Sequence, residues 1–145
     1  MTTATSGSDT MLSVKPTALS GFHDASSYEK HRPTYPPSSV EYLLKAAKIL
    51  GESDVRILEI AAGTGKFTSL LAAREENFEI LAIEPHDEMR KVLTEKGMKN
   101  VKVIDGFAED LSSVSDEWAD AVIVAQVKIV LVLWYDMLID QGFHW

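Results

Sequence analysis

The feature that most constrains this chain is a glycine-containing turn between two apolar segments. Residues 55–60 form a short apolar run, Gly63 and Gly65 follow it, and residues 67–73 have the apolar spacing of a helix. Glycine allows positive φ angles and a close approach of a ligand to the backbone. The amides that open the following helix then face that ligand. The sequence therefore predicts a strand, a tight turn and a helix that together bind a small ligand.

The spacing of the glycines excludes two common nucleotide-binding turns. A dinucleotide-binding fingerprint has a third glycine three residues after the second, and Thr68 occupies that position. A phosphate-binding P-loop has four residues between its first glycine and the Gly-Lys pair, whereas only Thr64 separates Gly63 from Gly65-Lys66. Neither pattern fits this turn.

A third pattern does fit. Glu59, Ala61, Gly63 and Gly65 form an acidic-x-Ala-x-Gly-x-Gly motif that resembles the first motif of class I S-adenosylmethionine-dependent methyltransferases. The resemblance implies an α/β fold, a Rossmann-like doubly wound and mostly parallel sheet, with S-adenosyl-L-methionine as the cofactor and these four residues at its site. An ordinary strand-to-helix turn is the alternative that the motif alone leaves open.

The composition of the chain argues against several other kinds of function. A chain of 145 residues with 46% hydrophobic residues predicts one globular domain with its own core. The net charge of −8 argues against a nucleic-acid partner, because phosphate neutralisation needs clustered Lys and Arg. The absence of cysteine excludes disulfides and thiolate metal sites, and the four histidines do not have metal-ligand spacing, so we predict no metal site.

The N-terminal part is expected to contain a tail and an arm. Residues 1–20 are rich in Thr and Ser and do not resemble a secretory signal, so we expect a flexible tail and a cytoplasmic location. Residues 21–37 mix aromatics with three prolines, which predicts a helical turn followed by an extended segment. This arm either fills the edge of the core or covers the ligand.

The arm resembles the one that precedes the nucleotide fold in small-molecule methyltransferases of the type 11 group, through Tyr28, Arg32-Pro33 and Tyr35-Pro36. That resemblance implies that Tyr28 and Arg32 face the cofactor. Arg32 would then lie near the cofactor carboxylate, which its planar guanidinium suits.

A second strand and two helices are expected around the glycine turn. Residues 38–50 predict a helix capped by Ser38 or Ser39, and residues 78–84 predict a strand ending in Glu84. An acid at the end of the second parallel strand can accept hydrogen bonds from ribose hydroxyls, although a solvent-exposed carboxylate is the alternative. Residues 87–96 predict another helix. By resemblance Pro85 and Met89 border the adenine, while Met89 equally suits the core.

Two further strands complete the expected sheet. Residues 100–106 predict a third strand, followed by a segment that resembles the third motif of the family. The resemblance implies that the Ala108 amide and the carboxylate of Glu109 or Asp110 meet the edge of the adenine. Residues 116–126 predict a fourth strand with Gln126 at its carboxyl end, where ligands bind in open α/β sheets. The alternation predicts helices on both faces.

Residues 127–141 are far more apolar than the preceding sequence. Deleting them joins Gln126 to the last four residues and restores the family pattern, so we hypothesise that the block is a translated retained intron. Transcript sequence would test this, because a CAA codon at Gln141 contradicts it. Charges interrupt the block, so no membrane span is expected. A genuine strand or helix that caps the sheet is the alternative.

The expected organisation is a tail (1–20), a cofactor domain with its arm (21–126) and an atypical C-terminal segment (127–145). Complete members of the family continue beyond the fourth strand, so the resemblance implies the cofactor half of a truncated enzyme. The expected function is methyl transfer to a small-molecule acceptor. No catalytic residue is assigned, because the activated methyl needs no covalent nucleophile and His144 is the sole late base candidate.

Two other functions remain open from sequence. A truncated methyltransferase-like chain that binds the cofactor weakly, or that acts only as an interaction module, would have the same cofactor motifs. A nicotinamide-dependent oxidoreductase would share the glycine turn and Glu84, but Thr68 and the Ala108-Glu109 segment disfavour it. The oligomeric state is not predicted.

Overall fold

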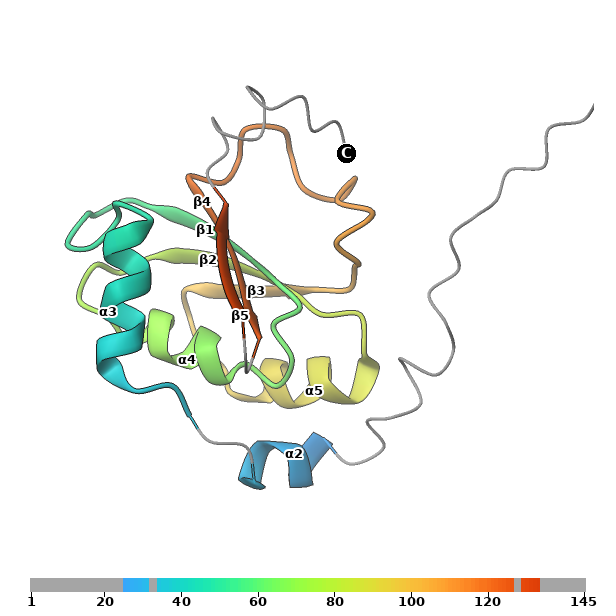
Figure 1. Ribbon diagram of the computed structural model, residues 1–145. Helices are drawn as coiled ribbons and strands as arrows, with labels where there is room; N and C mark the ends of the chain where they lie inside the picture. The colour runs from blue at the N-terminus through green and yellow to red at the C-terminus, as the bar shows by residue number, and fades with distance from the viewer. Residues whose placement is uncertain (1–24, 32–33, 127–128, 134–145) are drawn as a thin grey trace, which may run out of the picture.

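A computed structural model describes residues 25–31, 34–126 and 129–133 (Figure 1). The predictions for the tail, for Arg32 and for residues 134–145 lie outside the described residues, as do those for the side chains of Tyr28 and Gln126. The elements in chain order are α2 (Ala25–His31), α3 (Pro37–Ala46), β1 (Arg56–Ile60), α4 (Lys66–Ala72), β2 (Glu79–Ile83), α5 (Asp87–Glu95), β3 (Val101–Ile104), β4 (Ala121–Gln126) and β5 (Ile129–Leu133).

Helix α3 begins differently from the expected serine cap. Pro36 is its N-cap residue and Pro37 its first residue, and no side chain caps the helix. Proline suits this position because its missing N–H would have no partner in the first turn and its φ is already helical. The prediction that Ser38 or Ser39 caps the helix is therefore wrong, although the helix itself is confirmed.

The five strands form one sheet in the order β3-β2-β1-β4-β5. Strands β1 to β4 are parallel, with Leu58 of β1 between Leu81 of β2 and Val122 of β4. This arrangement confirms the Rossmann-like, mostly parallel α/β fold. Strand β5 comes from the apolar block 127–141 and pairs antiparallel with β4, so this part of the block forms a strand of the sheet.

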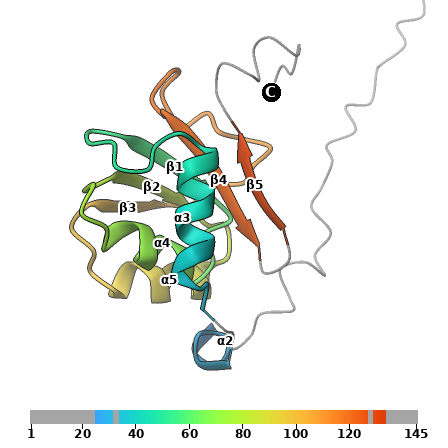
Figure 2. The same ribbon diagram turned by 60° about the vertical axis from the view of Figure 1, so that its left-hand side comes forward.

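One face of the sheet is covered by helices (Figures 1 and 2). Helices α3 and α4 pack on it through Leu44 and Leu71, which contact the same cluster as Ile57 of β1 and Ile80 of β2. Helix α5 lies beside α4, and Leu93 of α5 comes within contact of Gly65 at the start of α4. These buried side chains fix α4 and α5 against the strand ends that they follow.

The second face of the sheet is covered by an irregular segment. Leu58 and Leu81 belong to a cluster packed by Leu111, Val114 and Trp118 from the connection between β3 and β4. The Trp118 ring lies under the Arg56 guanidinium, 5.9 Å from ring centroid to Cζ. Within the described residues the expectation of helices on both faces is therefore not met. Serine-rich turns in this connection, rather than a helical apolar period, explain the difference.

Across the described ranges, no helix has both the length and the apolar character needed to cross a bilayer.

Candidate functional site

The glycine turn joins β1 to α4 and has an unusual backbone. Ala61, Gly63 and Gly65 all have positive φ angles, of 57°, 62° and 85°. The Ala62 amide donates to the Ile83 carbonyl at 3.0 Å, which ties the turn to the end of β2. Because parallel strands end at the same edge of a sheet, the turn and the segments after β2 and β3 lie at one edge.

The two positions in the turn favour glycine for different structural reasons. Among the described residues, a Cβ atom at Gly63 would meet only the Met89 sulfur, at 3.9 Å, so this part of the structure leaves the backbone there open to a ligand. A Cβ atom at Gly65 would lie 2.2 Å from Cδ1 of Leu93. Gly65 therefore permits the close packing of α5 against the turn. Met89 is itself buried at 5% exposure, so it fills the core beside Gly63.

Glu84 reaches from the end of β2 to the glycine turn. Its Oε2 accepts the Gly63 amide at 2.7 Å and its Oε1 accepts the His86 amide at 2.9 Å. The side chain is 5% exposed. Each carboxylate oxygen has a second lone pair, so the group can accept further hydrogen bonds from a bound hydroxyl. The structure thus brings together Gly63 and Glu84, two predicted site residues that are 21 positions apart in sequence.

Glu59 lies beneath the turn. It is 1% exposed, and its Oε2 accepts a hydrogen bond of 2.6 Å from the hydroxyl of Thr68 in α4. Burial, together with the nearby Glu84 carboxylate, raises the pKa of Glu59 to about 7, although the Thr68 hydrogen bond opposes this shift. Thr68 occupies the position of the third glycine in the dinucleotide pattern, and here its hydroxyl anchors the acid of β1 to α4.

The raised pKa of Glu59 predicts a pH-dependent stability. The folded carboxyl keeps its proton up to about pH 7, whereas the unfolded chain releases it near pH 4.5. Wild-type stability should therefore fall as pH rises between these values, by about 3 kcal/mol at 1.36 kcal/mol per pKa unit. The Glu59→Gln variant keeps the acceptor for Thr68 but does not titrate, so it should match wild type at about pH 4, below the unfolded pKa, and exceed it at pH 8. Urea unfolding at both pH values measures this, and parallel profiles would contradict it.

The segment after β3 packs against the end of β2. A Cβ atom at Gly106 would lie 3.0 Å from Cγ2 of Ile83, and Ala108 packs against the cluster on the second face. The Asp110 carboxylate accepts the Ser112 amide at 3.0 Å, and hydrogen bonds from the Ser112 side chain and then its amide lower the pKa of Asp110. Glu109 is exposed. Of the two acids expected to meet the adenine, Asp110 is therefore engaged within its own loop.

Glu29 connects the arm helix α2 to the glycine turn. Its Oε2 accepts a hydrogen bond from the Thr64 hydroxyl, and its Oε1 accepts a hydrogen bond from Nζ of Lys96 at 2.7 Å. Burial opposes ionisation of Glu29, but the contacts from Lys96 and Thr64 outweigh it and lower its pKa. Sequence reasoning missed Glu29, because its partners are 35 and 67 residues away and no local pattern marks them.

Replacing Glu29 should loosen the arm. The Glu29→Gln variant loses the ion pair with Lys96, which is partly exposed and so contributes about 1 kcal/mol. We expect amide hydrogen exchange in α2 to become about fivefold faster, as measured by mass spectrometry. Lys30→Gln changes an exposed neighbour on the same helix and is the control. Equal exchange rates in the two variants would show that Glu29 does not hold the arm.

For the remaining predicted site residues that it describes, the structure gives the element to which each belongs or which it follows. Pro85 follows β2 and is half-buried, and Tyr28 belongs to the arm helix. The backbone of Gln126 ends β4, opposite Ile129 of β5. No group of three or more metal-ligating side chains is found in the ranges that the structure describes.

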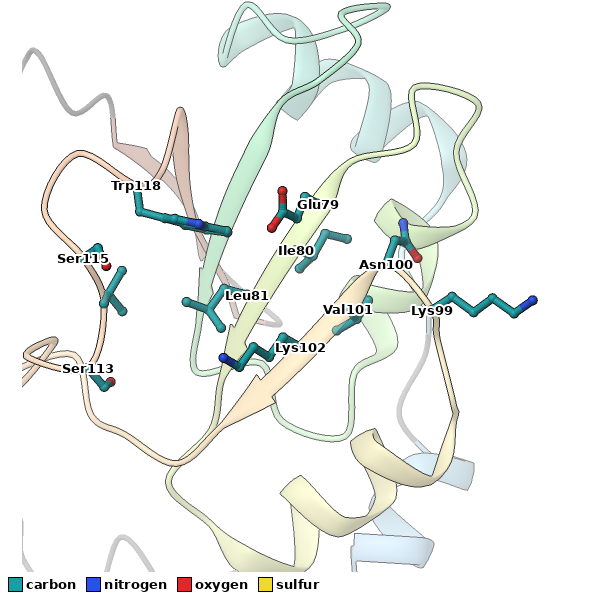
Figure 3. A pocket seen from close by; sticks show the side chains of 11 residues that line it. Glu79, Ile80, Leu81, Lys99, Asn100, Val101, Lys102, Ser113, Ser115 and Trp118 are labelled. Carbon is teal, nitrogen blue, oxygen red and sulfur yellow. The ribbon is translucent and has the colours of Figure 1, made fainter.

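A separate hollow of about 340 Å³ lies on the second face of the sheet (Figure 3). It is lined by the first residues of β2 and β3 and by the connection to β4, including Leu81, Lys102, Ser115 and Trp118. None of the predicted site residues whose side chains the structure describes lines it. The hollow and the edge with Gly63 and Glu84 are therefore distinct parts of the molecule.

Comparison with known proteins agrees with this geometry. Residues 57–139 match the sequence model of a family described as a methyltransferase domain. An uncharacterised methyltransferase from Mycobacterium tuberculosis is 38% identical over 99 residues, which are 68% of this chain and 37% of that protein. A probable S-adenosylmethionine-dependent methyltransferase from Saccharomyces cerevisiae is 33% identical over 109 residues, covering 71% and 35% of the two chains.

A solved structure has the same fold. The crystal structure of an S-adenosylmethionine-dependent methyltransferase from Aquifex aeolicus superposes with a TM-score of 0.51 and 25% identity, covering 70% of this chain and 56% of that one. The chain spans little more than a third of the length of the curated relatives named above. Since the family match covers more than half of its residues, the chain belongs to the methyltransferase domain family.

Proposed function

We propose that this chain binds S-adenosylmethionine at the carboxyl edge of β1, β2 and β3. Its function would then be to supply the cofactor site for methyl transfer to a small-molecule acceptor. The observation that carries the proposal is the contact of Glu84 with the Gly63 amide, because it joins a buried acceptor to an open stretch of backbone. Family membership and the fold support the same cofactor.

The residues at this edge suit the parts of an adenosyl group. Glu84 would accept hydrogen bonds from the ribose hydroxyls through its remaining lone pairs. The backbone at Gly63 would lie against the methionine part, since a side chain there would fill the space. Ala108 and Glu109 would meet the adenine edge, with Pro85 beside the ring, while the buried Met89 would lie behind it as part of the core. Tyr28, Arg32 and Gln126 stay predictions for the same site, and Ala61 and Glu59 would support the turn.

The protein's part in the reaction is to bind and orient. When bound, the cofactor supplies a methyl group already activated on a sulfonium, so no covalent nucleophile is required. The protein would contribute by holding this group in line with the acceptor, since fixed proximity and orientation lower the barrier. Helix α2, fastened by Glu29 to Thr64, would exclude water from one side of the site. A small acceptor fits the net charge of −8 better than a nucleic acid does.

Isothermal titration calorimetry with S-adenosylmethionine, S-adenosylhomocysteine and NAD tests the proposal. We expect both sulfur-containing ligands to bind, and NAD to bind more than about tenfold more weakly, because Thr68 replaces the third glycine of the dinucleotide turn. Preference for NAD would replace the methyl-donor assignment by a nicotinamide site. Failure of all three ligands to bind a folded chain would favour a non-binding interaction module instead.

A further inference from the structure

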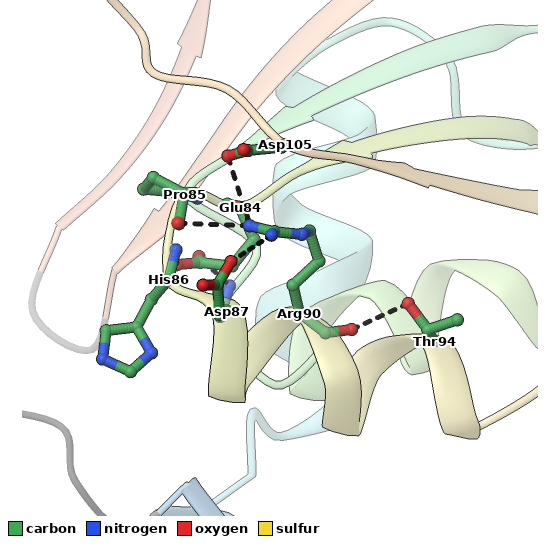
Figure 4. Close-up of polar contacts among 8 residues, drawn as sticks. Glu84, Pro85, His86, Asp87, Arg90, Thr94 and Asp105 are labelled. Atoms are coloured by element: carbon green, nitrogen blue, oxygen red, sulfur yellow. Dashed lines mark hydrogen bonds and ion pairs between the residues drawn. The ribbon is translucent and has the colours of Figure 1, made fainter.

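Arg90 forms hydrogen bonds with the loops that follow two neighbouring strands (Figure 4). Its Nη1 donates to the Glu84 carbonyl at 2.8 Å, to the Pro85 carbonyl at 3.1 Å and to Oδ1 of Asp105 at 3.2 Å. Its Nη2 pairs with Asp87 at the start of the same helix. The first two acceptors follow β2 and the third follows β3, so one guanidinium connects two strand ends.

These contacts begin where the sheet stops. The last backbone bond between the two strand ends runs from the Glu84 amide to the Ile104 carbonyl at 3.1 Å. Beyond it the chain after β2 enters α5 and the chain after β3 enters the segment that contains Ala108 and Glu109. Arg90 lies in the first turn of α5. Its backbone amide donates a hydrogen bond to the His86 carbonyl at 2.9 Å, which fixes the start of the helix. Arg90 thus sets the separation of the two loops after the ladder has ended.

Arg90 and the glycine turn hold Glu84 through different groups. The Gly63 and His86 amides hold its carboxylate, whereas Arg90 holds its carbonyl. Hydrogen bonds from a charged donor are shorter and stronger than neutral ones, and a planar guanidinium can reach acceptors on two chains at once. The Asp87 and Asp105 ion pairs each contribute less than the carbonyl contacts, because the two aspartate side chains are 85% and 67% exposed.

The geometry points to Arg90 as a positioning residue for the nucleoside half of the cofactor site, an inference that rests on the proposed function. It acts through the Glu84 and Asp105 loops and does not itself contact the ligand. Without Arg90, the ribose-binding carboxylate and the adenine-binding segment keep their own contacts but lose their fixed separation. The loss should therefore fall on ligands that contain adenosine, whether or not they carry the amino-acid part.

Calorimetry on the Arg90→Met variant tests this inference, with two ligands. S-adenosylhomocysteine and 5′-methylthioadenosine should both bind about tenfold to a hundredfold more weakly, by the same factor, because both contain the nucleoside. Arg90→Lys should also weaken binding, since a single ammonium cannot span the two loops. Lys91→Met removes an exposed cation from the next position of the same helix and should leave both affinities within about twofold.

A double-mutant cycle separates positioning from simple loss of structure. Asp105→Asn alone should weaken binding by several-fold, and it should add little in the Arg90→Met background, because both changes break the same connection. Additive effects, or wild-type affinity in a folded Arg90→Met variant, would overturn the inference. If Arg90→Met fails to fold, Arg90→Lys and Asp105→Asn carry the same test.

Hydrogen exchange keeps this inference distinct from the proposed function. If the wild-type chain binds neither ligand, the methyl-donor assignment fails, but Arg90→Met should still speed amide exchange at Glu84 and His86 and leave Leu58 in the middle of β1 unchanged. Unchanged exchange at Glu84 and His86 would overturn the role of Arg90 whatever the ligand result.

Discussion

The Glu84→Gln variant should bind S-adenosylhomocysteine about a hundredfold more weakly than wild type, as measured by calorimetry. The carboxylate is buried, accepts the Gly63 and His86 amides, and would accept both ribose hydroxyls. The Gln side chain has the same shape but replaces one acceptor oxygen by an N–H donor, which would face another donor. Losing charged hydrogen bonds of this kind costs about 3 kcal/mol, which corresponds to the expected change in Kd.

Glu79→Gln is the matched control for this experiment. Glu79 begins the same strand that Glu84 follows, and its side chain is exposed at the opposite end of β2. The same chemical change there should leave the affinity unaltered, because an exposed carboxylate at that end makes no contact with the glycine turn. Equal losses in the two variants would mean that net charge, and not the contact between Glu84 and the turn, governs binding.

The Gly65→Ala variant should lower the melting temperature by about 10 °C. The new Cβ atom would lie 2.2 Å from Cδ1 and 3.4 Å from Cγ of Leu93, which is buried at 1% exposure, so Leu93 would have to shift within the packed core. A side chain at a φ of 85° adds backbone strain. Overpacking and strain together cost about 3 kcal/mol, which gives the expected shift for a domain of this size. Differential scanning calorimetry measures it.

Gly97→Ala separates the two contributions. Gly97 follows α5 and also has a positive φ, of 62°, but a Cβ atom there would have no neighbour within 4 Å in the part of the chain that the structure describes. Only the backbone cost of about 1–2 kcal/mol applies, so the shift should be roughly half as large. If the two variants melt at the same temperature, the contact between Leu93 and the turn does not contribute.

Much of the fold follows from short-range patterns. The apolar runs of β1, β2 and β4 and the helical spacing of α3, α4 and α5 are visible in sequence because each element buries one face. The meeting of Gly63 and Glu84 was also predictable, since consecutive parallel strands end at the same edge. The serine cap of α3 was wrong, because a proline begins that helix, and among the described residues no helix covers the second face, because turn residues occupy the connection from β3 to β4.

Other features of the site depended on contacts between distant parts of the chain. The sequence pattern predicted that Gly65 faces the ligand. The structure shows in addition that Leu93 lies too close to this position for a side chain. Glu29 and Arg90 have no distinctive pattern in the sequences of their own helices. Their roles become visible only from their contacts with Thr64 and Asp105. No local spacing pattern in α2 or α5 indicates these two contacts, because their partners lie far away in the sequence.

Features that the sequence alone determined differ from those that required the tertiary structure in the range of the interactions behind them. Local spacing was sufficient for the strands, for the glycine turn and for the acid after β2, because backbone sterics and one-sided burial act over a few residues. Folding decided the ionisation of Glu59, the fastening of the arm to Thr64 and the connection of the β2 and β3 loops through Arg90. Those properties come from burial and charge at distances that are short in space and long in sequence.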